Sequence, residues 1–102
     1  MADSESSTES SNYRLPGNLT LQHASKLAVV EDKPIMLDYW SLSLEKSVII
    51  GVKDDNEKLL VKSEDEYTSP IKNLYSVDEC YIICTENSIY ITASDIPKKR
   101  IS

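Results

Sequence analysis

Apolar and polar residues alternate in two runs near the C-terminus, Glu79–Thr85 and Ser88–Ala93, on either side of the polar pair Glu86 and Asn87. Side chains alternate along a strand with a period of two, and directly paired residues point to the same face. The pattern therefore predicts a β-hairpin with one largely apolar face that includes both cysteines of the chain. With a turn at Glu86 and Asn87, the predicted pairs are Cys84 with Ile89, Ile82 with Ile91 and Cys80 with Ala93.

A second hairpin is predicted from the runs Ser47–Lys53 and Lys58–Lys62, which are joined by the polar segment Asp54–Glu57. Acidic and amide residues are typical of turns between strands. If Lys53 lies opposite Lys58, Val52 pairs with Leu59 and Ile50 pairs with Val61 on one face of the hairpin. The acidic segment between the strands lacks the alternating ligands and central glycine of an EF-hand loop, so we interpret it as a solvated turn.

One amphipathic helix is predicted before these strands, ending near Val30. Its apolar positions follow helical spacing, and Asn18 or Thr20 could cap its first turn. Pro34 prevents the helix from continuing. His23, the only histidine, lies off the apolar stripe and is interpreted as a surface residue. The residues of the apolar stripe are Leu21, Ala24, Leu27 and Ala28.

The segment Ile35–Trp40 predicts a further strand, with bulky side chains on both faces. Trp40 has two interpretations: it anchors the core beneath the helix, which we favour, or it contributes with Leu42 to a surface that binds a partner protein. An acidic connection, Ser63–Ile71, follows the second predicted hairpin, and its polarity predicts exposure. The candidate partner-binding residues are Trp40, Leu42, Glu64, Asp65, Glu66 and Tyr67.

Residues 1–14 are mostly serine, threonine and acidic residues, which cannot bury enough apolar surface to become ordered. We therefore predict a disordered acidic tail over 1–14 and a single domain over 15–102. Serines next to acidic residues or proline resemble kinase sites, although the same composition is typical of solubilising tails. The possible phosphorylation sites are Ser4, Ser6, Ser7 and Ser69.

The net charge of −6 and the pI near 4.7 argue against a protein that binds the phosphate backbone of nucleic acids. The basic run Lys98–Arg100 is short and is interpreted as a solvated tail. The acidic start differs from a secretory signal, and we find no run long enough to span a membrane, so we expect an intracellular, cytoplasmic protein. Free thiols fit such a reducing compartment. No cofactor or metal ligand set is apparent.

The chain resembles small proteins of nucleocytoplasmic large DNA viruses in the general character of three segments, and no diagnostic motif is involved. These segments are Lys33–Trp40, Leu59–Ile71 and Glu86–Ile91. The resemblance covers roughly residues 18–101 and carries no functional residues with it. Proteins of that kind are often virion components or factors that act in the host cytoplasm. The resemblance therefore implies a virion-associated or accessory role, which agrees with unbridged cysteines.

Together these patterns predict an α+β fold in which the N-terminal helix packs on a bent, mostly antiparallel five-stranded sheet. A small SH3-like barrel is the alternative architecture for the same elements. The function that we expect is a non-enzymatic module for protein–protein interaction or assembly, through a protein partner or self-association. The alternative is a small nucleic-acid-associated barrel, which the basic C-terminal run would serve.

Overall fold

The computed structural model of the protein describes residues 14–101. The tail expected over residues 1–14, including Ser4, Ser6 and Ser7, lies outside the described residues except for Arg14. The described chain is an α+β fold of two helices and two four-stranded sheets. In chain order the elements are α1 (Asn18–Glu31), β1 (Ile35–Met36), α2 (Trp40–Leu44), β2 (Ile49–Val52), β3 (Lys58–Ser63), β4 (Glu66–Tyr67), β5 (Ile71–Val77), β6 (Cys80–Thr85), β7 (Ile89–Ala93) and β8 (Lys98–Arg100).

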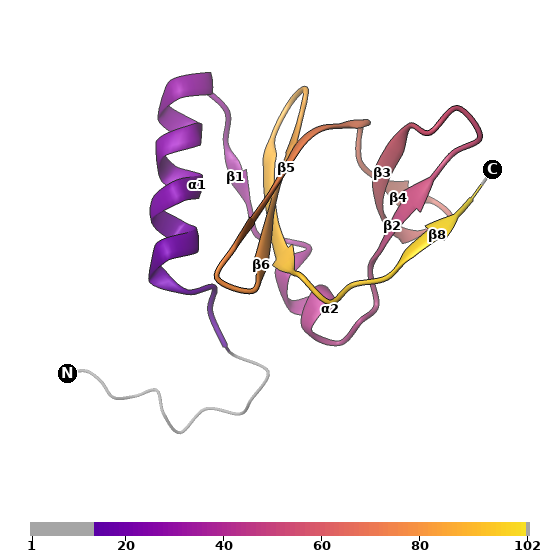
Figure 1. Ribbon diagram of the computed structural model, residues 1–102, viewed down its shortest axis with the longest axis horizontal. Coiled ribbons are helices and arrows are strands. Elements are labelled where there is room, and N and C mark those ends of the chain that lie inside the picture. Colours follow the sequence, from indigo (N-terminus) through magenta and orange to yellow (C-terminus); the bar gives the residue numbers. More distant parts are fainter. Residues whose placement is uncertain (1–13, 102) are drawn as a thin grey trace.

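The two sheets replace the single five-stranded sheet that we predicted. The first sheet has the strand order β1-β7-β6-β5 and the second has the order β4-β3-β2-β8. Most neighbours are antiparallel, but β1 pairs with β7 and β8 pairs with β2 in parallel. Within residues 14–101 the sheets do not close into a barrel. Figure 1 shows α1, the first sheet and the second sheet as three successive layers.

The C-terminal hairpin has the predicted register. Cys84 pairs with Ile89, Ile82 with Ile91 and Cys80 with Ala93. Strand β5 was not predicted as a strand, yet it pairs with β6 along its length. Its connection to β6 is a two-residue turn in which Asp78 and Glu79 have φ of 53° and 64°. Positive φ at both central positions is the geometry that lets a two-residue turn match the twist of its strands.

The hairpin of β2 and β3 exists as predicted, but its register differs by one residue. Val52 lies opposite Lys58 and Ile50 lies opposite Leu60. The cause is Asn56, whose φ of 69° places it in the left-handed region. The Lys53 N–H consequently donates to the carbonyl of Glu57 at 2.8 Å, which leaves a three-residue loop in place of the four residues that we expected.

The strand predicted over Ile35–Trp40 is wrong beyond Met36. The chain turns there, and Trp40 begins the short helix α2. The turn sends Tyr39 and Trp40 to two different apolar clusters. The alternation of bulky side chains over these six residues is compatible with a strand. It is equally compatible with a turn whose side chains enter two different apolar clusters, so the sequence pattern could not distinguish the two.

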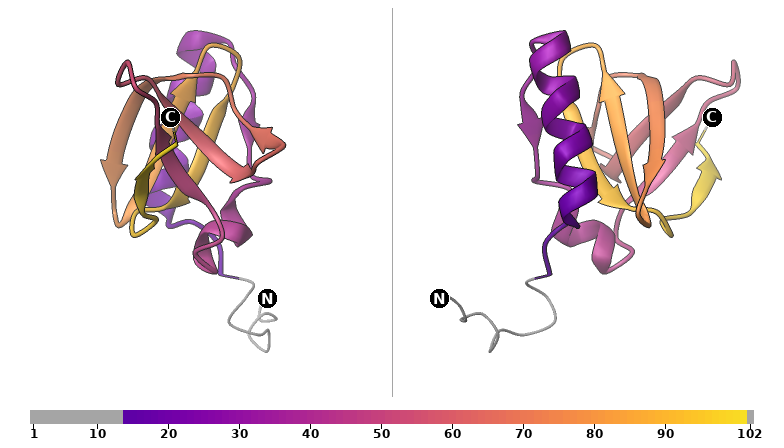
Figure 2. Two further views of the ribbon diagram at one scale, coloured as in Figure 1. Left: turned by 90° about the vertical axis from the view of Figure 1, so that its right-hand side faces the viewer. Right: turned by 60° about the vertical axis from the view of Figure 1, so that its left-hand side comes forward.

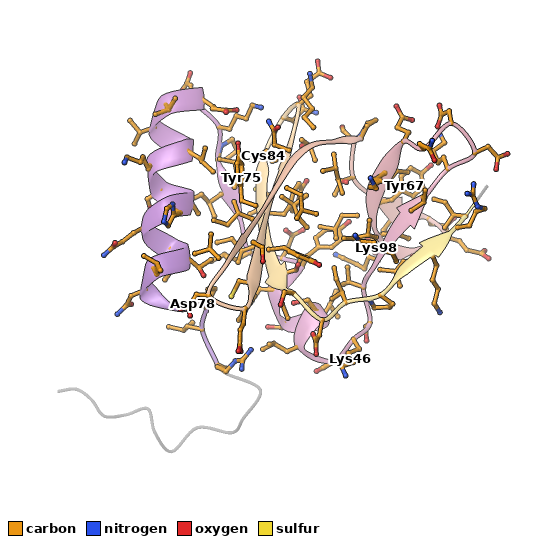
Figure 3. All side chains as sticks on the ribbon, in the orientation of Figure 1. Lys46, Tyr67, Tyr75, Asp78, Cys84 and Lys98 are labelled. Carbon is orange, nitrogen blue, oxygen red and sulfur yellow. The ribbon has the colours of Figure 1, made fainter. Side chains whose placement is uncertain are left out.

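Helix α1 packs with the predicted stripe against the first sheet, and Ala24 is fully buried there. Its N-cap is Gly17 rather than Asn18 or Thr20, and no side chain caps it. The hydroxyl of Thr20 instead donates to the carbonyl of Val77 at 3.0 Å. A Cβ on Gly17 would approach a carboxylate oxygen of Asp78 to 2.7 Å, so this carboxylate lies at the helix start (Figure 3). Neither α1 nor α2 is long and apolar enough to cross a membrane.

Two apolar clusters cover the two faces of the first sheet. The first lies between this sheet and α1, and the second lies between the two sheets. Figure 2 shows the corresponding order of the layers, with the first sheet between α1 and the second sheet. Because the strands β6 and β7 are apolar on both faces, each face needs its own cover. The buried residues of the first cluster are Ala24, Trp40, Cys80, Ile82, Cys84, Ile89 and Ile91, and those of the second are Tyr39, Val48, Ile50, Leu60, Ile83 and Ile96.

Ser43 joins α2 to the end of β7 through its fully buried hydroxyl. Its Oγ donates to the carbonyl of Trp40 at 2.6 Å and accepts the N–H of Ala93 at 2.9 Å. This N–H points away from the β6 partner, because Ala93 occupies a non-hydrogen-bonded pair with Cys80. The serine hydroxyl therefore accepts a hydrogen bond from the buried N–H of Ala93, which has no partner within the sheet.

We expect Ser43→Ala to lower the free energy of unfolding by about 1–3 kcal/mol, because the N–H of Ala93 would be buried without an acceptor. Urea unfolding followed by circular dichroism measures this change. The control is Ser41→Ala, at an exposed position of the same helix, for which we expect a change within about 0.5 kcal/mol. Equal stabilities of the two variants would contradict the proposed role of the hydroxyl.

Candidate functional site

Both cysteines are free and buried in the first cluster, as the sequence predicted. Cys80 is 4% exposed and Cys84 is fully buried, and Figure 3 places Cys84 on the first sheet. Burial raises the pKa of the Cys84 thiol, and the nearby carboxylate of Glu31 adds to this effect, whereas Lys33 opposes it. A protonated thiol without solvent access is a poor nucleophile. The thiols are therefore packing groups.

We expect both thiols to resist labelling by a thiol reagent such as a disulfide-exchange dye in the native protein. Labelling should then follow unfolding, because each sulfur becomes accessible only when the cover of α1 is lost. The measurement is the labelling rate as a function of urea concentration. Rapid modification of either thiol in the absence of urea would show that this cluster opens to solvent.

Tyr39 forms a ring cluster between the two sheets. Its ring meets that of Tyr90 edge to face at a centroid distance of 5.3 Å, and the ammonium of Lys62 lies 4.6 Å from its centroid. Burial raises the pKa of Tyr39 from 10.0 to about 12, with smaller contributions from Tyr90, Asp38 and Glu66. The folded protein therefore keeps this phenol protonated at a pH where the unfolded chain ionises it.

The pKa of Tyr39 predicts a loss of stability from pH 10 to about 12. In this window the folded state binds more protons than the unfolded state, so the free energy of unfolding falls as the pH rises. The rise of the Tyr39 pKa from 10.0 to about 12 corresponds to a decrease in the free energy of unfolding of about 2–3 kcal/mol across this window. Chemical unfolding at both ends of the window, compared between the native protein and Tyr39→Phe, measures it. Parallel pH profiles for the two proteins would contradict the assignment.

The second sheet has one face toward the core and one outer face, which in the described part of the chain carries an apolar groove. Ile50 and Leu60 point inward and are fully buried. By alternation, their neighbours in β2 and β3 point outward. The groove has a volume of about 540 Å³. We define the outer face by its apolar residues, Ile49, Leu59, Val61, Tyr67 and Ile101, which all line this groove.

Gly51 shapes the floor of the outer face. A Cβ at this position would lie 2.6 Å from Cδ1 of Ile101 and 3.1 Å from a methyl group of Val61, so the absence of a side chain allows Ile101 to cross β2 closely. The N–H of Ile101 also donates to the carbonyl of Val52 at 2.9 Å. Glycine inside a strand often marks such an approach. It keeps the apolar surface continuous from β4 to the end of β8.

Charges of opposite sign lie at the two edges of the second sheet. The acidic residues Glu64 and Asp65 form the exposed turn between β3 and the edge strand β4, and Glu66 begins β4. The hydroxyl of Ser63 accepts two backbone N–H groups of this turn at 3.2 Å. At the opposite edge, the run Lys98–Arg100 forms β8, so our interpretation of this run as a solvated tail is wrong.

The predicted partner-binding residues are divided among different parts of the fold. Tyr67 and Glu64 line the groove of the outer face, and the ring of Tyr67 is 59% exposed (Figure 3). Trp40 is only 5% exposed and lies in the first cluster, where its Nε1–H donates to the carbonyl of Arg14 at 2.7 Å. The favoured interpretation of Trp40 as a core anchor is therefore confirmed. Leu42 packs against the second cluster.

Ser69 and His23 lie away from the outer face groove. The Oγ of Ser69 accepts a hydrogen bond from the side chain of Asn87 at 3.3 Å. His23 is exposed on α1. Among residues 14–101, no group of three or more His, Cys, Asp or Glu residues is arranged to hold a metal ion.

The chain matches no protein-family model, and searches of curated proteins and of solved structures also gave no match.

Proposed function

We propose that this protein is a non-enzymatic assembly module that forms a dimer through the outer face of its second sheet. The occupant of the groove is the same face of a second copy. The observation that carries this proposal is an apolar face bounded by an acidic edge on one side and a basic edge on the other. Both thiols and the buried indole are used for packing, which supports a binding role rather than catalysis.

The apolar part of the outer face supplies the attraction. Tyr67 and Ile101 are 59% and 37% exposed, and the groove between them is lined by aliphatic side chains. Removing apolar surface from water contributes about 25 cal/mol per Å². Sheets pack face to face when both present such surfaces. A four-stranded face is about 19 Å wide, from strand spacings of ~4.8 Å, so we expect a weak dimer rather than a permanent one.

The charged edges make the outer face complementary to itself. A two-fold axis that lies in the interface and runs parallel to the strands exchanges the two edges, so the acidic turn of one copy lies over β8 of the other, twice in each dimer. Lys99 pairs with Gly51, and paired residues share a face, so its side chain belongs to the outer face. A partner with one sign of charge would be repelled at one edge. A second copy meets opposite charge at both.

In the viral setting that the sequence resemblance implies, self-association of this kind would suit a structural or accessory component.

The proposal predicts a dimer that charge reversal abolishes and that mixing restores. Glu64→Lys with Asp65→Lys makes both edges of the outer face basic, and Lys99→Glu makes both edges acidic. Each charge-reversal variant should be monomeric, because like charges meet at both ends of the interface. An equimolar mixture of the two should form heterodimers, because every contact is again between opposite charges. Sedimentation equilibrium at low ionic strength over a range of concentrations measures both effects.

The matched control is Glu45→Lys with Glu86→Lys, which makes the same change in net charge at exposed positions away from the outer face. It should dimerise like the native protein. Tyr67→Ser tests the apolar part and should weaken dimerisation about tenfold, because exposed tyrosines are common anchors of interfaces. A native protein that stays monomeric at every concentration, or charge-reversal variants that dimerise as it does, would overturn the proposal.

A further inference from the structure

A cleft with a volume of about 320 Å³ lies where the second sheet meets β5, and lysines from three separate strands line it. Lys58 begins β3, Lys72 lies in β5 and Lys98 begins β8. Asn56 and Asn73 belong to the same lining, and Ile71 and Leu74 are its apolar residues. The remaining lining residue is Glu57.

The strand register explains why the lysines meet. Lys98 pairs with Ile50 and Lys58 pairs with Val52, and both partners lie on the face of β2 that is directed toward the first sheet. Paired residues share a face, so Lys58 and Lys98 extend from the inner face of the second sheet toward β5. Lys72 lies in β5, the strand that contributes the other wall. The lysines therefore surround the cleft from both sheets.

These lysines have no carboxylate partner among residues 14–101. The described ion pairs join Lys33 with Glu31, Lys46 with Asp95, Lys53 with Glu57 and Arg100 with Asp54. The only carboxylate of the cleft lining, that of Glu57, lies 3.5 Å from the ammonium of Lys53. Three uncompensated positive charges in one cleft are unusual in a chain with a net charge of −6.

We propose that this cleft binds a compact phosphate-bearing anion, such as a pyrophosphate or a phosphate monoester. Lysine ammonium groups act as point charges for phosphate oxygens, and amide N–H groups add directional hydrogen bonds. The net charge of −6 favours a compact anion over a long nucleic-acid backbone, because repulsion between the chain and a polyanion grows with the length of the polyanion. The inference is independent of dimerisation, since Lys58 and Lys98 lie on the inner face of the second sheet and Lys72 lies in the first sheet.

The test is titration of the full-length protein with inorganic pyrophosphate at low ionic strength, at a protein concentration where it is monomeric. Amide resonances of Asn56, Asn73 and Lys98 should shift in a saturable manner, and calorimetry should give one site. Lys72→Gln should weaken the affinity about tenfold by removing one charged hydrogen-bond donor. Lys26→Gln is the matched control, because Lys26 is an exposed lysine of α1 without an ion pair in the described chain, and it should bind like the native protein.

Further measurements decide between the possible ligands. Competition of a phosphate monoester with pyrophosphate for the site would support the proposal, and the relative affinities would identify which of the two anions binds more tightly. Absence of saturable shifts, or equal losses for Lys72→Gln and Lys26→Gln, would overturn it. Tighter binding of single-stranded RNA than of pyrophosphate, with a steep salt dependence, would also overturn it in favour of a nucleic-acid ligand. Unchanged circular dichroism of both variants confirms that they fold.

Discussion

The requirement that the first sheet bury both of its faces determines the rest of the architecture. The pair β6 and β7 carries Ile82 and Ile91 on one face and Ile83 on the other, and all three are fully buried. A strand pair that is apolar on both sides cannot be exposed on either. Helix α1 covers one side and the second sheet covers the other (Figure 1). Tyr39 and Trp40, adjacent in the chain, anchor these two covers in different clusters.

The second sheet is the outermost layer, and this position produces both candidate binding surfaces. On its inner face, Ile50 and Leu60 pack in the core. Near the hairpin turn, lysines replace apolar residues on this face, and the cleft begins there. Its outer face has no layer of residues 14–101 packed beyond it and keeps apolar side chains in a groove. Both candidate binding surfaces therefore lie at the boundary of the layered core, whereas the thiols and the indole lie inside it.

The sequence predicted those elements whose local pattern agrees with their environment. The register of β6 with β7 and the stripe of α1 were predicted correctly, because the polar turn and the helical spacing on which they depend are each contained in one short segment. Strand β5 was missed because Ile71, Leu74 and Val77 are spaced by three residues. A register irregularity between Ile71 and Asn73 lets Ile71 and Leu74 pack against the same cluster, whereas Val77 packs against the other one. The register of β2 and β3 depended on the left-handed backbone of Asn56, which residue type alone does not fix.

Candidate sites were predictable only where one segment supplied them. The acidic turn and Tyr67 adjoin in the chain and were found together, but Lys58, Lys72 and Lys98 come from three strands that only the fold brings together. The basic run of β8 shows why composition could not resolve this. Because side chains alternate along a strand, Lys98 joins Ile50 on the inner face and Lys99 joins Gly51 on the outer face. One short basic segment therefore charges two surfaces, so its net charge alone could indicate neither of them.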